Sequence, residues 1–217
     1  MITRRDASTG LIAAASFAPL VAAEAALESQ PMKLPPPRTD GGIALMQALK
    51  LRRSIRSFSS RKLEPQTLSD LLWAAFGINR SGDLHTAPYW RHVMVLDIYL
   101  AMADGVWIYD PKAHAVLPHL ADDLRVFTGT QDFVASAPLN LVYVGHGERM
   151  SDIPPEERRV YASVDAGFIG QNVYLYCASA SLGSVFRASI DRPRLEGALK
   201  LPKEQFVTCA QSVGFPQ

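Results

Sequence analysis

Six basic side chains and no acidic ones lie between Lys50 and Lys62. Within this run, Arg52, Arg53 and Ser54 place two guanidinium groups next to a hydroxyl. Such groups, held at the end of a helix, form the charge-assisted hydrogen bonds that a terminal phosphate accepts. The run therefore indicates either an anion site or a solvated basic surface, and the spacing alone does not separate the two.

Other patterns of catalytic residues are absent from the sequence. It has no Gly-x-Gly-x-x-Gly turn, and neither Lys nor Ser/Thr follows the P-loop spacing of Gly77 and Gly82. It also lacks the His-Glu-x-x-His and Gly-x-Ser-x-Gly patterns. Cys177 and Cys209 are too few for a thiolate zinc site and are expected to be buried thiols. We therefore predict no metal and assign no side chain as general acid or base.

Composition excludes several classes of protein. The chain has 217 residues, 48% hydrophobic and 20% charged, which is typical of a globular domain. Its 22 Lys and Arg against 21 Asp and Glu give a net charge of +1. Because nucleic-acid binders carry an excess of positive charge, binding of nucleic acid through Lys50 to Lys62 is the least favoured interpretation.

The N-terminus resembles an export signal. Thr3-Arg4-Arg5-Asp6 precedes an apolar run from Leu11 to Ala23, and small residues then offer a cleavage site. This pattern is similar to a twin-arginine signal over residues 1–25 and predicts a protein that is periplasmic or otherwise exported. The run is shorter than the roughly 20 residues that span a bilayer, so we expect no stable membrane span. The alternative is a frayed helix at the start of a cytoplasmic protein.

The rest of the chain reads as a Pro/Gly-rich arm over 26–42 and one domain over 43–217. Apolar periodicity predicts helices over 43–53, 65–76, 154–182 and 192–201, and strands over 93–102, 106–109, 115–117, 139–144, 184–186 and 206–213. Helices and strands do not alternate regularly, which favours an α+β fold. The helix over 154–182 is apolar on more than one face, which favours packing against a second subunit.

Five segments together carry a resemblance to a known family. Arg52 to Phe58 resembles the R-R-S-x-R-x-F signature of the nitroreductase family of FMN-dependent oxidoreductases. Residues 71–80, 86–88 and 105–111 are similar to its azoline-oxidising (SagB-type) branch. Residues 165–172 and 213–216 resemble its dimer-core helix and last strand. The resemblance implies a nitroreductase-like α+β fold with a mostly antiparallel sheet, a long dimer-core helix and a homodimer.

The same resemblance implies a cofactor and its ligands. Arg52, Arg53 and Ser54 would hold the phosphate of FMN, and Arg56 would lie near its ribityl chain or pyrimidine edge. A fixed cation there stabilises the negative charge of reduced flavin. The backbone N–H groups facing flavin N5 would be those of Phe186, Arg187 and Ala188. The expected reaction is ping-pong hydride or electron transfer with a small organic or peptide substrate.

Two departures from the family pattern bear on this prediction. After Ala87-Pro88 the family usually has Ser, Asn and Gln side chains that bond the flavin ring, whereas this chain has Tyr89-Trp90-Arg91-His92. Tyr89 and Trp90 could instead stack on the flavin ring or fill the substrate pocket, with Pro88 also in contact with the cofactor. They could equally mark a divergent, non-catalytic relative that binds an anionic or aromatic ligand. No C-terminal Lys or Arg is present, which places more of the phosphate binding on Arg52 and Arg53.

Overall fold

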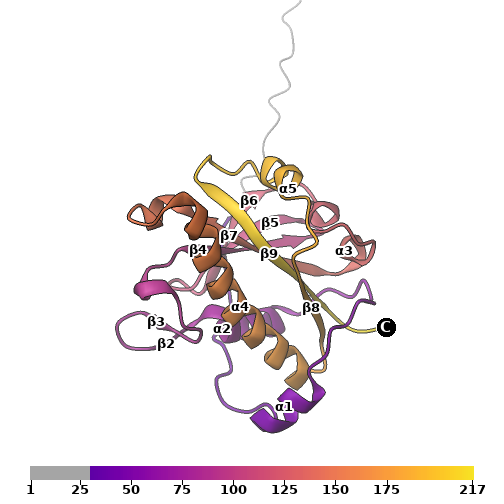
Figure 1. Cartoon of the computed structure of the whole chain (residues 1–217). Helices are drawn as coiled ribbons and strands as arrows, with labels where there is room; N and C mark the ends of the chain where they lie inside the picture. Colours follow the sequence, from indigo (N-terminus) through magenta and orange to yellow (C-terminus); the bar gives the residue numbers. More distant parts are fainter. Residues whose placement is uncertain (1–29) are drawn as a thin grey trace, which may run out of the picture.

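A computed structural model describes residues 30–217, so the predicted export signal lies outside the described residues. Its main sheet has seven strands, and every pairing between them is antiparallel (Figure 1). In spatial order the strands are β1 (Met32–Lys33), β6 (Ala115–Leu120), β5 (Gly105–Asp110), β4 (Leu96–Met102), β7 (Leu139–His146), β9 (Gln205–Gly214) and β8 (Gly183–Arg187). A separate hairpin consists of β2 (Ile78–Arg80) and β3 (Leu84–His85).

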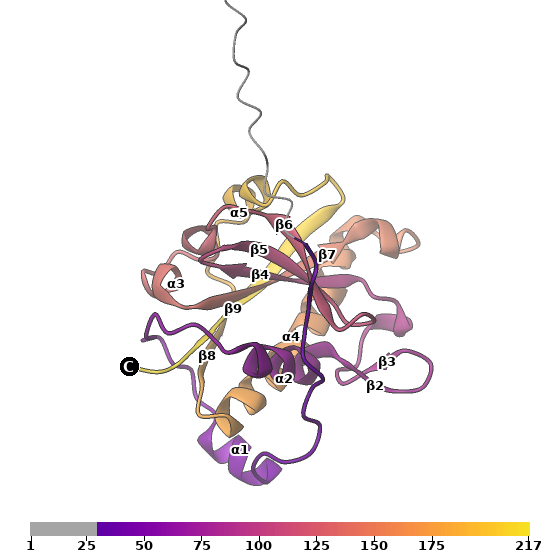
Figure 2. The ribbon, with the colours of Figure 1, turned by 180° about the vertical axis from the view of Figure 1, so that it is seen from behind.

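Helices cover both faces of the sheet (Figure 2). They are α1 (Leu45–Leu51), α2 (Pro65–Phe76), α3 (Phe133–Ser136), α4 (Pro155–Ser179) and α5 (Arg192–Ala198), with short 3-10 turns η1 (Trp90–His92), η2 (Arg125–Phe127) and η3 (Gly147–Met150). Helices α2 and α4 pack on one face and α5 packs on the other. This arrangement is the predicted α+β fold. In the described part of the chain, no helix is long and apolar enough to cross a membrane.

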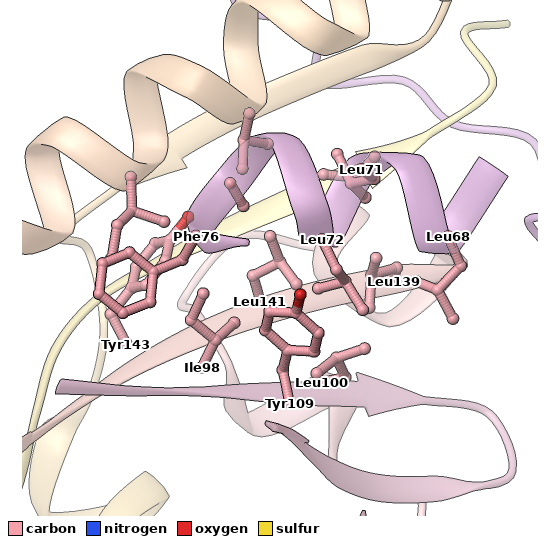
Figure 3. Packing of buried hydrophobic residues seen from close by; sticks show 14 of the residues in the cluster. Leu68, Leu71, Leu72, Phe76, Ile98, Leu100, Tyr109, Leu139, Leu141 and Tyr143 are labelled. Atoms are coloured by element: carbon pink, nitrogen blue, oxygen red, sulfur yellow. The ribbon is translucent and has the colours of Figure 1, made fainter. Parts of the chain in front are cut away.

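The main core lies between α2, α4 and the sheet (Figure 3). Alternation along β4 directs Ile98 and Leu100 into this core, whereas Tyr99 and Ala101 join the core under α5. Helix α2 begins with Pro65 in its first turn and ends before Gly77, where a Cβ atom would lie 2.3 Å from the Trp73 ring.

Leu71→Ala is expected to lower the free energy of unfolding by about 2–5 kcal/mol. The Leu71 side chain of α2 is fully buried in the main core, so its removal loses apolar contacts and leaves a cavity. Urea unfolding of the variant measures the loss. A change below about 1 kcal/mol would mean that the core collapses around the smaller side chain.

Most elements lie where the sequence predicts them, with three differences. The strand predicted over 93–102 begins only at Leu96, because Arg91 and His92 adopt left-handed backbone angles. The β2–β3 hairpin and α3 were not predicted. The arm is extended, as its prolines require, but it is part of the domain. Strand β1 pairs with β6, and the Arg38 side chain forms an ion pair with Asp70 of α2.

Candidate active site

The segment that follows α1 lies against the edge of the main sheet. Helix α1 ends at Leu51 and is followed by Arg52, and Ser54 then forms a parallel bridge with Ser184 of the edge strand β8. The Ile55 N–H donates to the Ser184 carbonyl at 2.9 Å. This contact fixes the predicted phosphate-binding residues beside the free edge of β8.

A cavity of about 360 Å³ lies at this corner. It is lined by Leu51, Arg52, Arg53, Ile55, Tyr174, Cys177, Ala178, Ser181, Leu182, Ser184 and Pro216. The Arg52 guanidinium lies over the Tyr174 ring, 5.0 Å from its centroid. Among residues 30–217, no carboxylate forms an ion pair with Arg52, Arg53 or Arg56. The cavity therefore has two guanidinium groups whose charge is not neutralised by the described part of the chain, which suits an anionic ligand.

Arg56 and the C-terminus take different positions around this corner. Ser54 and Arg56 are exposed and do not line the cavity, so of the four predicted residues the structure places Arg52 and Arg53 in its wall, with Ser54 next to them at the rim. Pro216 does line the cavity, and the backbone N–H of Gln217 donates to the Ser57 carbonyl at 3.3 Å. The last described residues therefore form one wall of the cavity.

Tyr174 of α4 connects Ser54 with Phe186, which lie in two different segments of the predicted cofactor site. Its hydroxyl is 2.8 Å from the Ser54 hydroxyl and accepts a 2.8 Å hydrogen bond from the Phe186 backbone N–H. Sequence reasoning missed this residue. Within a long apolar helix a tyrosine carries no signal that distinguishes a site residue from a packing residue.

The Arg187 side chain points away from this corner into the interior. It donates to the Asn140 amide oxygen at 2.8 Å and to the Ser212 hydroxyl at 3.0 Å, and it also bonds the Thr128 carbonyl. Burial lowers the pKa of Arg187 to about 10. The side chain therefore ties β8 to β7 and β9, while Ala188, exposed, follows the end of the strand.

A second group of predicted site residues lies beside the N-terminal half of α4, away from the cavity at Arg52. This group is Pro88, Tyr89 and Trp90. The Tyr89 ring packs edge-on against His85, with centroids 5.0 Å apart, and against Phe76 at 5.5 Å. The backbone N–H of Trp90 donates to the Asp165 carboxylate at 3.0 Å. In the next two residues Arg91 and His92 have φ angles of 45° and 57°, which is uncommon for residues other than glycine.

The two groups of predicted residues contact opposite sides of α4. Asp165, which holds the Trp90 loop, and Tyr174, which holds Ser54, are nine residues apart in this helix. Nine residues correspond to about two and a half turns and about 13 Å of rise. A single chain therefore does not bring Arg52 and Tyr89 together at one ligand-binding surface.

Asp165→Asn is expected to change how stability depends on pH. Burial raises the pKa of the Asp165 carboxyl to about 6. A carboxyl whose pKa is raised in the folded state favours folding in its protonated form. Its contribution to the free energy of unfolding is fully present below about pH 4 and is lost as the pH rises towards about 6. Between about pH 4 and pH 7, the wild type should therefore lose about 1–3 kcal/mol more free energy of unfolding than the variant. Urea unfolding at the two pH values measures this difference, and parallel profiles would contradict it.

The described geometry is that of an α+β protein with a cavity lined by two arginines at a sheet edge, and comparison with known proteins agrees with the fold. The Nitroreductase family model matches residues 49–215. A candidate nitroreductase of Methanocaldococcus jannaschii is 31% identical over 153 residues, which cover 66% of this chain and 77% of that protein. The chain belongs to the Nitroreductase family, as its Arg52 to Phe58 segment predicts.

Solved structures support the same assignment. The crystal structure of a candidate nitroreductase from Ralstonia eutropha JMP134 is 40% identical, with a TM-score of 0.84, and the match covers 88% of this chain and 91% of that one. An NADPH:FMN oxidoreductase from Vibrio harveyi, solved with NAD⁺, is 22% identical with a TM-score of 0.57 over 80% of this chain and 69% of that one, which shows the fold alone. The nitroreductase-like fold is confirmed, and the chain is a nitroreductase-like oxidoreductase.

Proposed function

We propose that this protein is an FMN-dependent oxidoreductase whose cofactor phosphate binds at Arg52, Arg53 and Ser54. The observation that carries the proposal is the cavity at the edge of β8, which is lined by two guanidinium groups without carboxylate partners among residues 30–217. A phosphate monoester would supply the missing negative charge and several acceptor oxygens. The lining residues therefore fit the anionic end of FMN.

When bound, FMN supplies the hydride and electron chemistry, and the protein supplies position and electrostatics. Phe186, Arg187 and Ala188 lie at the free edge of the sheet, where outward N–H groups alternate along the strand. The Phe186 N–H already donates to the Tyr174 hydroxyl. Ala188 is therefore the next of the three residues whose backbone N–H faces the outer side of the strand. We expect Arg56, which is exposed beyond the cavity, to reach the ribityl chain or pyrimidine edge of the flavin.

We further propose that the site is completed by a second copy of the chain. Val160, Val164 and Phe168 are 61%, 49% and 45% exposed along one side of α4, which runs across the front of Figure 1. At about 100° per residue, Val164 lies between the sides that carry Asp165 and Tyr174. A homodimer formed on this apolar stripe would border both groups of site residues. It would allow Tyr89 and Trp90 to contact a flavin whose phosphate is held by the partner.

The substrate is proposed to be a small organic molecule or a peptide, oxidised or reduced in a ping-pong cycle. Similarity of residues 71–80, 86–88 and 105–111 to the azoline-oxidising branch supports a dehydrogenase role. Export by the N-terminal signal, which stays a prediction, would separate the protein from cytoplasmic NAD(P)H. The electron donor would then be a different reductant.

A second candidate is a non-catalytic relative that binds an anionic or aromatic ligand in the former flavin pocket. It is favoured by the loop at Tyr89 and Trp90, which replaces the polar ring contacts with aromatic packing. The absorption spectrum of protein purified from the cytoplasm separates the two candidates. A yellow sample with one FMN per chain supports the oxidoreductase. A colourless sample that does not take up added FMN supports the second candidate.

A further inference from the structure

The Tyr174 hydroxyl is the middle of a short hydrogen-bonded chain. On one side it receives the Phe186 backbone N–H at 2.8 Å, and on the other it lies 2.8 Å from the Ser54 hydroxyl oxygen. These two contacts connect the edge strand β8 to the segment that carries Arg52 and Arg53. The Arg52 guanidinium over the Tyr174 ring adds a third contact to the same side chain.

The backbone N–H of Phe186 and the hydroxyls of Tyr174 and Ser54 differ in how they can donate and accept hydrogen bonds. A backbone N–H can only donate, so the Tyr174 oxygen is the acceptor of the first bond. Accepting one hydrogen bond polarises the phenol and strengthens its own O–H as a donor. Either hydroxyl can donate in this bond, and the arrangement that uses the polarised phenol is the one in which Tyr174 donates and the Ser54 oxygen accepts. This arrangement leaves the Ser54 hydrogen free to donate to another group.

We propose that Tyr174 is a positioning residue that makes Ser54 a dedicated hydrogen-bond donor to the phosphate of FMN. This inference rests on the proposed function and adds a specificity mechanism to it. The ligand oxygen that Ser54 meets must be an acceptor, as a phosphate oxygen is. Riboflavin has no phosphate, so the Tyr174–Ser54 bond should favour FMN over riboflavin.

Tyr174→Phe tests the proposal because it keeps the ring under Arg52 and removes only the hydroxyl. We expect FMN affinity to fall about fivefold, since a net hydrogen-bond contribution is on the order of 1 kcal/mol. Riboflavin affinity should stay within about twofold, and Ser54→Ala in the Tyr174→Phe background should add little, because the two residues act through one bond. Titration of the apoprotein with each flavin, followed by fluorescence quenching, gives the dissociation constants.

Tyr176→Phe is the matched control. Tyr176 is also half-buried in α4, and its hydroxyl donates to the Thr67 carbonyl at 3.3 Å, away from the cavity at Arg52. This variant should bind both flavins like the wild type. Thermal melting of all variants shows that they are folded.

The outcomes separate this inference from the proposed function. If the wild type binds no FMN, the proposed function fails. If the wild type binds FMN, three results would overturn the role of Tyr174 alone. They are unchanged FMN affinity in Tyr174→Phe, equal losses for FMN and riboflavin, or losses from Tyr174→Phe and Ser54→Ala that simply add.

Discussion

Replacing Arg52 and Arg53 together by alanine is expected to weaken FMN binding by about a hundredfold or more. Each hydrogen bond to a charged group contributes roughly 1.5–3 kcal/mol, and the double variant removes at least two. Both side chains line the cavity beside β8 and lack carboxylate partners in the described part of the chain. Equilibrium dialysis and the flavin absorbance of purified protein measure the loss.

Arg61→Ala is the control for this prediction. Arg61 belongs to the same basic run, but it stacks over the Phe215 ring at 4.1 Å and does not line the cavity. The Arg61→Ala substitution removes one positive charge from the same basic run and should leave FMN binding nearly unchanged. Retention of flavin by the Arg52/Arg53 double variant, or an equal loss in Arg61→Ala, would contradict the assignment of the phosphate site.

Phe168→Glu is expected to convert the proposed dimer to a monomer. Phe168 is 45% exposed and is the last residue of the apolar stripe of α4, so a dimer built on this stripe would bury two carboxylates without partners. The dissociation constant of the dimer should rise by at least about a hundredfold, since an uncompensated buried charge costs several kcal/mol. Sedimentation velocity over a range of concentrations measures it. Because the site is proposed to span both copies, flavin should be lost with the dimer.

Val126→Glu provides a matched control for the dimer. Val126 is 53% exposed in η2, a different element, and the substitution introduces the same charge. It should leave the association state unchanged. A Phe168→Glu protein that stays dimeric would mean that the subunits associate through another surface.

The helices and strands of the domain could be predicted where residues close together in the sequence determine them. Pro65 and Gly77 set the ends of α2, and short apolar runs on either side of the turn at Asp110-Pro111 set β5 and β6, because each signal is contained within a few residues. The turn after Trp90 was not predictable. Its left-handed residues Arg91 and His92 are held by contacts to distant parts of the chain, including the ion pair of Arg91 with Asp152.

The family, the α+β class and the basic run that carries the candidate phosphate site could be read from the amino-acid sequence, because they depend on residue types at fixed local spacing. Which of those residues lie together follows from the three-dimensional packing. It placed Arg52, Arg53 and Ser54 beside β8, put Tyr174 between them and Phe186, and left the Tyr89 loop on the other side of α4. The contact of Ser54 with Tyr174 joins residues 120 positions apart and that of Trp90 with Asp165 residues 75 apart, so they follow from packing of α4 against the sheet and not from any local pattern.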